Sequence, residues 1–366
     1  MPPATPSLDR EATLEVHPEA HSEVRHRPAH AIDAAPRTRG ATGVKGVLLP
    51  VAVVLAIGTI FVTVYLAAFH APRPRHLPVA AVGTDQQVLQ VEAGLDAGLP
   101  GGFSVTMYPS EAEARQAVEH REVYAAYLAP GTPGAVGRNP KLLYAGANGP
   151  SVTGTVTGAF GAVAKAGGHQ LTQQDIVPSS SGDTRGMSVF YAAFGLILAG
   201  YLFGMMTYQI APRLQFRWRM VSVASFGVLG GAIIGLLSGS TGFGALPGSF
   251  YGIAGITAMM AAAAGLATMV FMRLVGSAGL SLASVVLLTL GNSTSGGVMP
   301  PQYLPDWLRP LSEILPVGVG VRAIQGASYF HNDGLTRGIA VLAGWIVACA
   351  AILYARDVLA RRQTAA

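Results

Sequence analysis

The sequence is poor in charged residues and has almost no cysteine. Only 12% of its 366 residues are Asp, Glu, Lys or Arg, whereas 51% are hydrophobic, and the mean hydropathy is +0.43. A soluble domain carries about 25% charged residues, so this composition indicates a membrane protein. The single cysteine, Cys349, excludes an intrachain disulfide and a cysteine-based metal site. The net charge of +5 forms no basic stripe interleaved with aromatic residues, which leaves nucleic-acid binding unsupported.

Ionisable residues are missing from the interior of the apolar runs. These runs cover residues 46–68, 187–210, 220–239, 250–272, 274–291 and 336–355. Proton- and ion-coupled transporters usually place ionisable groups inside their spans, so this absence argues against such a transporter. The sequence also has no G-x-x-x-x-G-K-[ST] phosphate loop, no H-E-x-x-H zinc motif and no histidine within a run to activate a serine. We therefore expect neither an enzyme nor a metal site.

The apolar runs predict an α-helical polytopic membrane protein with six transmembrane helices. The first, in residues 44–69, follows a polar tail of residues 1–43 that we expect to be disordered, so we interpret it as a span and not as a cleaved signal peptide. Five more lie in residues 187–355, and residues 356–366 form a C-terminal tail. Basic residues gather on one side: Arg37, Arg39, Lys45, Arg213, Arg217, Arg219, Arg273, Arg356, Arg361 and Arg362. The positive-inside rule therefore predicts a multi-pass protein of the cell membrane with both termini in the cytoplasm.

Residues 70–186, between the first two spans, alternate strand-like and helical patterns. We expect strands at 77–83, 103–109, 123–130 and 141–147, and helices at 85–98, 110–120 and 151–168, with residues 174–180 closing the block. Such alternation predicts an α/β domain with βαβ crossovers, and the charge distribution places this domain outside the cytoplasm. Ser110, with Glu113 three residues later, predicts a capping box at the start of the second helix.

The loop "APRLQFRWRM", residues 211–220, is a candidate functional segment on the cytoplasmic side. Its spacing predicts a short helix with Arg213 and Arg217 on one face and Leu214 and Trp218 on another. The loop either anchors the chain at the membrane or docks a cytoplasmic partner.

Small residues recur every four positions in the third span, at Gly227, Gly231, Gly235 and Gly239. This pattern favours close contact between helices in lipid. The contact is either ordinary packing within the chain or the surface of a helix that slides or dimerises.

The fifth apolar run gives way to "GNSTSGGVMPPQYLPDWLRPLSEILP", residues 291–316. Its polar residues 292–295 can hydrogen-bond backbone groups freed at a helix end, and its prolines prevent the helix from resuming. Beyond them, one helical face is predicted for Trp307, Leu308, Leu311, Ile314 and Leu315. We expect residues 292–325 to form an outer re-entrant segment, the alternative being a plain outer loop with an amphipathic helix. Its candidate gate residues are Asn292, Gly296, Gly297, Pro300, Pro301, Pro305, Trp307, Leu315 and Pro316.

The layout of one span, an outer α/β domain, five spans and a Gly/Pro-broken outer segment resembles the membrane subunit of ABC-2 type transporters, in the phage-infection-protein-like branch. The resemblance covers about residues 44–360 and is best over "GNSTSGGVMPPQYLPDWLRPLSEILPVGVGVRAI", with a further match at "EVYAAYLAPG". The chain has Ser293 where the family often has a proline after the asparagine.

The resemblance implies a permease that dimerises with a second copy or a related subunit and binds no cofactor itself. ATP and Mg²⁺ would be bound by a separate ATP-binding cassette subunit. That subunit would contact Arg213, Phe216, Arg217, Trp218 and Arg219, and the outer segment would gate the exit. The uncharged spans suggest that the exported substrate is amphipathic or lipid-like. The alternatives are a non-transporting receptor or sensor whose outer domain binds a ligand, and an ion-independent secondary transporter or channel.

Overall fold

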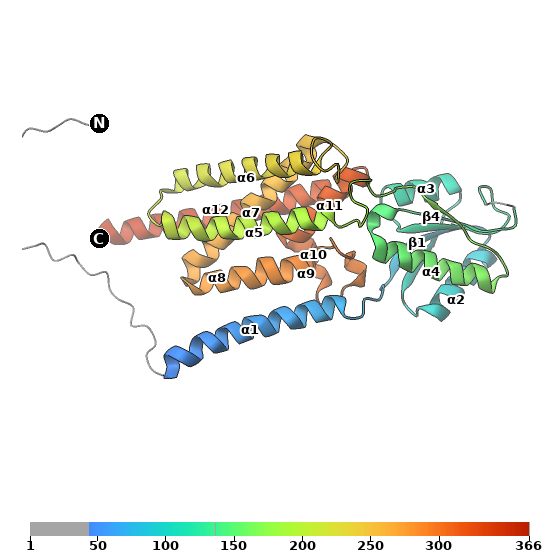
Figure 1. The fold of residues 1–366 in the computed structure, drawn as a ribbon, viewed down its shortest axis with the longest axis horizontal. Coiled ribbons are helices and arrows are strands. Elements are labelled where there is room, and N and C mark those ends of the chain that lie inside the picture. Colours follow the sequence, from blue (N-terminus) through green and yellow to red (C-terminus); the bar gives the residue numbers. More distant parts are fainter. Residues whose placement is uncertain (1–43, 136, 366) are drawn as a thin grey trace, which may run out of the picture. The chain divides into compact units, whose positions relative to one another are not determined.

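The computed structural model describes residues 44–135 and 137–365, and Figure 1 shows the order of their helices and strands along the chain. The chain divides into a first unit, residues 1–52, and a second unit, residues 53–366. Helix α1 (Val44–Phe69) begins in the first unit and continues into the second, which holds all the other elements. The tail expected for residues 1–43 lies outside the described residues.

The α/β domain that the sequence predicts follows α1. Its strands are β1 (Leu77–Val82), β2 (Phe103–Met107), β3 (Ala125–Leu128), β4 (Lys141–Tyr144) and β5 (Thr172–Asp175). Its helices are α2 (Asp85–Gly98), α3 (Glu111–Glu119), the 3-10 turn η1 (Gly146–Asn148) and α4 (Pro150–Ala166). The strand order is β2-β1-β3-β4-β5, and β3–β4 is the antiparallel pair. The helices α2, α3 and α4 therefore serve as crossovers between parallel strands.

The sheet is covered on both faces, as Figure 1 shows for its helices. Helices α2 and α4 cover one face with apolar side chains that include Leu95 and Phe160. Helix α3 covers the other face with Ala114 and Val118. That second face also buries Phe330, which follows a helix far along the chain and is 0% exposed. The domain core is therefore completed by a residue from the membrane-helix region.

Polar caps fix the starts of α2 and α3. Ser110 accepts a hydrogen bond from the backbone N–H of Glu113 at 3.2 Å, which confirms the predicted cap. A capping box would also need a bond from the Ser110 backbone N–H to the Glu113 side chain. Here the Ser110 hydroxyl donates to the Glu113 carboxylate instead. The reciprocal box occurs instead at the start of α2, between Thr84 and Gln87.

Five helices among the described residues are long and apolar enough to cross a membrane. They are α1, α5 (Ser188–Ile210), α6 (Phe216–Ser238), α7 (Phe250–Val275) and α12 (Leu335–Ala365). Most of α7 is buried, since it packs against α5, α6, α12 and the shorter α11 (Pro316–Tyr329). Helix α12 runs on to Ala365, so the C-terminal tail expected from residue 356 is a continuation of the last helix.

The fifth expected span, residues 274–291, is not one long helix. Helix α7 runs to Val275, and Gly276 breaks it with a φ of +65°, a conformation that favours glycine. The chain resumes as α8 (Ala278–Ala283), the π-helix η2 (Ser284–Leu290) and α9 (Gly291–Ser293). This apolar segment, Ala278–Ser293, is about 24 Å long at 1.5 Å per residue. It is shorter than the roughly 30 Å core of a bilayer.

Contacts nevertheless show that residues 278–293 connect the two ends of the long helices. Arg219, at the start of α6, and Arg273, near the end of α7, both pair with Asp357 of α12, and we call this the Asp357 end. At the opposite end, which we call the domain end, Gly297 packs against Phe190 in the first turn of α5. The segment therefore starts close to the Asp357 end and finishes at the domain end.

The polar cluster of residues 292–295, at the end of this segment, donates hydrogen bonds to backbone carbonyls, as the sequence predicts. The Asn292 side chain donates to the Leu288 carbonyl at 3.0 Å. Ser293 and Thr294 both donate to the Leu290 carbonyl, at 3.2 and 2.7 Å. The two hydroxyl bonds add to the backbone bond that the Thr294 N–H still makes to the Leu290 carbonyl at 3.1 Å, where α9 ends.

The outer segment continues as η3 (Pro301–Tyr303), α10 (Arg309–Ile314) and α11. The single apolar face predicted for residues 307–315 is wrong, because Leu308 and Leu315 are buried whereas Trp307 and Ile314 are exposed. The reason is a break: Leu315 has an extended ψ of 143° before Pro316 begins α11. Residues 307–315 therefore do not belong to one continuous helix.

Candidate functional site

The predicted cytoplasmic helix of residues 211–220 is wrong as a separate element. Residues 211–215 form a turn, and α6 begins at Phe216 after the extended Gln215. Arg213 and Arg217 therefore do not share a helix face. Arg213, Arg217 and Trp218 are exposed, and the Arg217 guanidinium lies 5.7 Å from the centre of a Trp218 ring. These three side chains belong to the exposed surface of the α5–α6 turn, together with Pro212 and Gln215.

Two other residues of this loop point into the protein. Arg219 is only 8% exposed; it donates to Asp357 at 3.1 Å and to the Leu214 carbonyl at 2.8 Å. The Phe216 ring meets Tyr354 of α12 edge-on, with 5.3 Å between ring centres. Both residues hold the turn to α12, whereas the family resemblance implies that they contact a partner subunit.

The glycine row of α6 faces α7. A Cβ added to Gly227 would lie 2.9 Å from the Ala258 carbonyl, and one added to Gly231 would collide with the Ala254 carbonyl. Gly235 packs against the Phe250 ring, and Gly239 is the residue after the helix. Packing within the chain therefore accounts for the three glycines of this row that lie inside α6.

The candidate gate residues do not form one surface. Asn292, Leu315 and Pro316 are buried where α9 ends and α11 begins, Gly297 contacts Phe190, Pro305 is half-buried and Trp307 is exposed. Gly296, Pro300 and Pro301 line a cavity of about 270 Å³.

Three parts of the chain line this cavity. The α/β domain supplies Arg121, Tyr124 and Asn148, the outer segment supplies Gln302 and Arg309, and helices α11 and α12 supply Arg322 and Arg337. The first turn of α11, with Gly318 and Val319, completes the wall.

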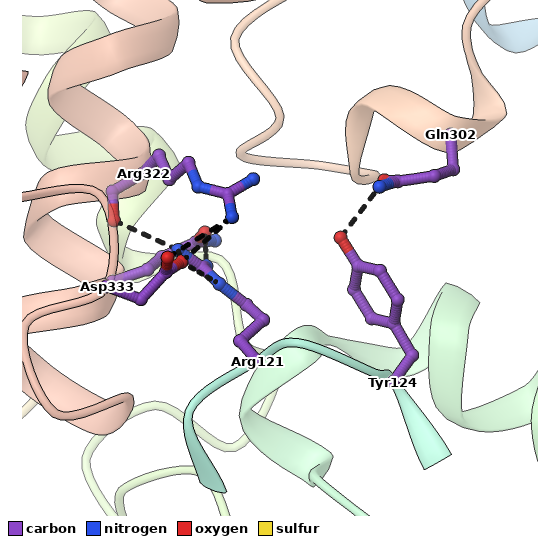
Figure 2. A network of polar contacts seen from close by, with 6 residues as sticks. Arg121, Tyr124, Gln302, Arg322 and Asp333 are labelled. Carbon is purple, nitrogen blue, oxygen red and sulfur yellow. Dashed lines mark hydrogen bonds and ion pairs between the residues drawn. The ribbon is translucent and has the colours of Figure 1, made fainter. Parts of the chain in front are cut away.

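Arg121 is the centre of a polar network on one side of the cavity, and Figure 2 shows it. Its Nε and Nη2 donate to the Asp333 carboxylate at 2.8 and 2.6 Å. Its Nη1 donates to Gln325 at 2.8 Å, and its Nη2 also reaches the Arg322 carbonyl at 3.2 Å. The Arg322 guanidinium binds the same carboxylate at 3.1 Å. One buried arginine thus joins the α/β domain to α11 and to the turn before α12.

Tyr124 makes a further link between the α/β domain and the outer segment, beside the bonds of Arg75 to the Gln302 and Tyr303 carbonyls. Its hydroxyl donates to the Gln302 side chain at 3.0 Å, on the other side of the view in Figure 2. Burial raises the pKa of Tyr124, so the phenol stays protonated and remains a donor at neutral pH. Burial lowers the pKa of Arg121 and the Arg322 charge lowers it further, whereas Tyr124 and Asp333 act in the opposite direction. A guanidinium remains charged in proteins even so, which makes Asp333 an obligatory partner.

Backbone strain gathers at the same place. Among the described residues, the non-glycine residues with positive φ are His76, Arg121, His331 and Asn332, with φ between 48° and 66°. His76 and Arg121 line the cavity, and His331 and Asn332 lie directly before Asp333. Such conformations persist only where the surroundings enforce them, and they cluster at functional sites. The strain therefore singles out this junction as the candidate site.

The sequence gives little warning of this site. Arg121 and Asp333 lie 212 positions apart, and no local pattern pairs them. One available signal is the presence of Arg309, Glu313 and Arg322 within an otherwise apolar segment. Among residues 44–135 and 137–365, no group of three or more His, Cys, Asp or Glu side chains is placed to hold a metal ion. Comparisons with protein-family models, with curated proteins and with solved structures give no match to this chain.

Proposed function

We propose that this protein is the membrane permease subunit of an ABC-2 type exporter, which moves an amphipathic or lipid-like substrate out of the cell. A separate ATP-binding cassette subunit would bind ATP and Mg²⁺ and hydrolyse the nucleotide. The observation that carries the proposal is the layout: one apolar helix, an inserted α/β domain, and then a set of long apolar helices that share a small-residue core. A single anchor would require none of this close packing between helices.

We infer six crossings of the membrane from the connection that residues 278–293 make between the two helix ends. This segment is shorter than the hydrocarbon core of the bilayer. It contacts α5 and α11, so part of its surface faces protein and not lipid, which reduces the cost of the length mismatch. Six crossings put both termini on one side. Arg213, Arg217 and Arg273 at the Asp357 end favour the cytoplasm for that side. The α/β domain then lies outside the cell membrane, at the domain end.

The ATP-binding cassette subunit would bind at the α5–α6 turn. Arg213, Arg217 and Trp218 are exposed there, and the Arg219–Asp357 pair fixes the turn to α12. A force on the turn would therefore act directly on α12. A second permease copy, identical or related, would complete the transporter; this part rests on the family resemblance, because the glycines of α6 already pack against α7.

The test is capture of the ATP-binding cassette subunit. Full-length tagged protein is purified from membranes of its own host, and co-purifying subunits are identified by mass spectrometry. We expect an ATP-binding cassette subunit with the wild type and a strong loss of it with Arg217→Glu combined with Trp218→Ala. Arg138→Glu, in an exposed loop of the α/β domain, makes the same charge change and should leave capture intact. An unchanged yield in the double variant, or no such subunit with the wild type, contradicts the proposal.

A receptor or sensor is the second candidate, because the cavity lies between the α/β domain and the helices. A ligand held there would contact both parts, and the Arg121–Asp333 pair would pass its effect to α12. Ligand binding without any associated ATP-binding cassette subunit would favour this function.

A further inference from the structure

The cavity at the domain end has an excess of positive charge. Arg121, Arg309, Arg322 and Arg337 line it, and Glu313 is the carboxylate that lines it with them. Glu313 is bound to Arg337 at 2.6 Å, and Asp333, just behind the wall, is shared by Arg121 and Arg322. Within the described part of the chain, the ion-pair partner of Arg309 is the distant Asp306, at 3.6 Å, whose side chain is 85% exposed. The Arg309 Nη2 also donates to the Arg75 carbonyl at 3.5 Å. An anion in the cavity would balance this charge.

Two hydrogen-bond donors on the cavity wall have no acceptor among the residues that the structure describes. The Nδ2 of Asn148 and the Nε of Arg309 are both buried and make no hydrogen bond. They come from different parts of the chain, since Asn148 ends η1 in the α/β domain and Arg309 begins α10. Buried donors normally have a partner, so an acceptor is expected between these elements.

The start of α11 contributes a further donor. Gly318, in its first turn, lines the cavity, and a backbone N–H at this position has no partner within the helix. The Val319 N–H, next along the wall, already binds the Leu315 carbonyl at 3.3 Å. Such a helix start attracts negative charge. The guanidiniums, the amide and the helix start thus approach from several sides, which suits the several oxygens of a tetrahedral phosphate better than a planar carboxylate.

The size and the position of the cavity indicate the source of that phosphate. About 270 Å³ is below the roughly 300–1,000 Å³ that encloses a drug-sized ligand, so the cavity fits a headgroup. Helix α10 forms one wall through Arg309, Ser312 and Glu313, whereas the flanking Trp307 and Ile314 are exposed. An exposed tryptophan beside apolar residues is typical of a membrane interface. Acyl chains could therefore stay in the membrane while the headgroup enters beside α10.

We propose that this cavity binds the phosphate headgroup of an anionic amphiphile. That this amphiphile is the transported substrate rests on the proposed function. That the cavity binds it does not. The acyl chains supply affinity through the membrane, and the arginines and the Asn148 amide supply selectivity for the phosphate.

The experiment measures binding by isothermal titration calorimetry with the full-length protein in detergent. Three probes separate the possible sources: dihexanoyl phosphatidic acid, inorganic phosphate, and dihexanoylglycerol, which has the same chains without the phosphate. We expect phosphatidic acid to bind more tightly than either of the others. Equal binding of phosphatidic acid and dihexanoylglycerol would show binding through the chains alone and overturn the proposal. Equal binding of inorganic phosphate would overturn the amphiphile as the source.

Two variants with opposite expected effects test the cavity itself. Arg337→Gln should weaken phosphatidic acid binding roughly tenfold or more, the loss expected for one hydrogen bond from a charged group. Glu313→Gln removes the negative charge from the wall and should tighten binding. Arg138→Gln is the matched control outside the cavity and should change nothing. Both wall residues are more than half exposed, so folded variants are expected, and thermal melting checks this.

The outcomes also separate this inference from the proposed function. Wild-type affinity in both Arg337→Gln and Glu313→Gln overturns the site, whatever partner the protein has. Phosphatidic acid binding that follows the two variants, without capture of an ATP-binding cassette subunit, retains the site and removes the exporter.

Discussion

Two clusters, each with one aspartate between two arginines, lie near opposite ends of α12 and differ in burial and surroundings. Asp333, just before α12, binds Arg121 and Arg322, whereas Asp357, near its other end, binds Arg219 and Arg273. The Arg121 side chain is 5% exposed and makes four hydrogen bonds; that of Arg219 is 10% exposed and makes two. The first cluster joins the α/β domain to the helices beside a cavity, while the second joins helices to one another.

The difference indicates separate roles for two similar sets of residues. The Asp357 cluster fixes the α5–α6 turn and the end of α7 to α12, so these elements move together. The Asp333 cluster connects the far end of α12, about 33 Å away at 1.5 Å per residue, to a domain and a cavity. In an exporter, α12 would therefore carry movement from the ATPase side to the outer cavity.

Removal of Asp333 should have the largest effect on stability. Asp333→Ala leaves the Arg121 charge buried with neutral acceptors only, and breaking a buried ion pair costs about 3–5 kcal/mol. We expect a large fall in Tm, measured by thermal melting of the detergent-purified protein. The α/β domain should also loosen from the helices, with faster proteolysis between residues 70 and 186.

Asp306→Ala is the matched control for this prediction. Its side chain is 85% exposed and lies 3.6 Å from Arg309, so its loss should leave the Tm within a degree or two of wild type. A similar Tm for Asp333→Ala and Asp306→Ala would mean that the buried network contributes nothing to the attachment of the domain.

Removal of Asp357 should have a smaller effect. Asp357→Ala leaves Arg219 bonded to the Leu214 carbonyl, and Arg273 is 34% exposed and can reach water. We expect a loss of about 1–3 kcal/mol, the range for a buried polar group left without a partner. The same melting experiment measures it, and proteolysis of the α/β domain should stay at the wild-type rate. Release of the domain by Asp357→Ala would contradict the separate roles of the two clusters.

Local signals explain why the α/β domain could be predicted and the cavity could not. Alternating apolar residues and the caps at Thr84 and Ser110 determine the elements of the domain from nearby residues. The antiparallel β3–β4 pair and the burial of Phe330 depend on contacts across the fold, for which the sequence carries no local sign. The same holds for Arg121 and Asp333, which meet only once the domain and the helices have folded.

The errors in the helical region have a similar physical cause. Residues 274–291 are uncharged and mostly apolar, so hydropathy does not reveal the break at Gly276 or the π-helix that follows. The α5–α6 turn has helical periodicity, yet Gln215 is extended and the helix starts only at Phe216. Periodicity therefore predicted helix for residues 211–215 as well, which form the turn, and not only for residues 216–220, which are helical.

A third ion-pair group, on the α/β domain, should have the smallest effect and should show it through pH. Glu111 binds Lys141 at 3.1 Å and Arg115 at 3.3 Å. Burial raises the pKa of Glu111, but the two cations outweigh burial and hold it below the ordinary 4.5. Because the unfolded chain then binds this proton more readily, the stabilisation is present above pH 4.5 and is lost as the pH falls through the folded pKa.

Glu111→Gln tests this pH dependence. The variant should be less stable than wild type at neutral pH by at most about 1 kcal/mol, since the group is partly exposed. Because the substituted amide side chain cannot titrate, the gap in Tm should close as the pH falls below 4.5. Glu92→Gln, at an exposed position of α2, should follow the wild type throughout. A difference in Tm that persists at low pH would show that Glu111 stabilises the fold through packing and not through its charge. Ion pairing would then contribute to stability only at deeply buried groups such as Arg121 and Arg219.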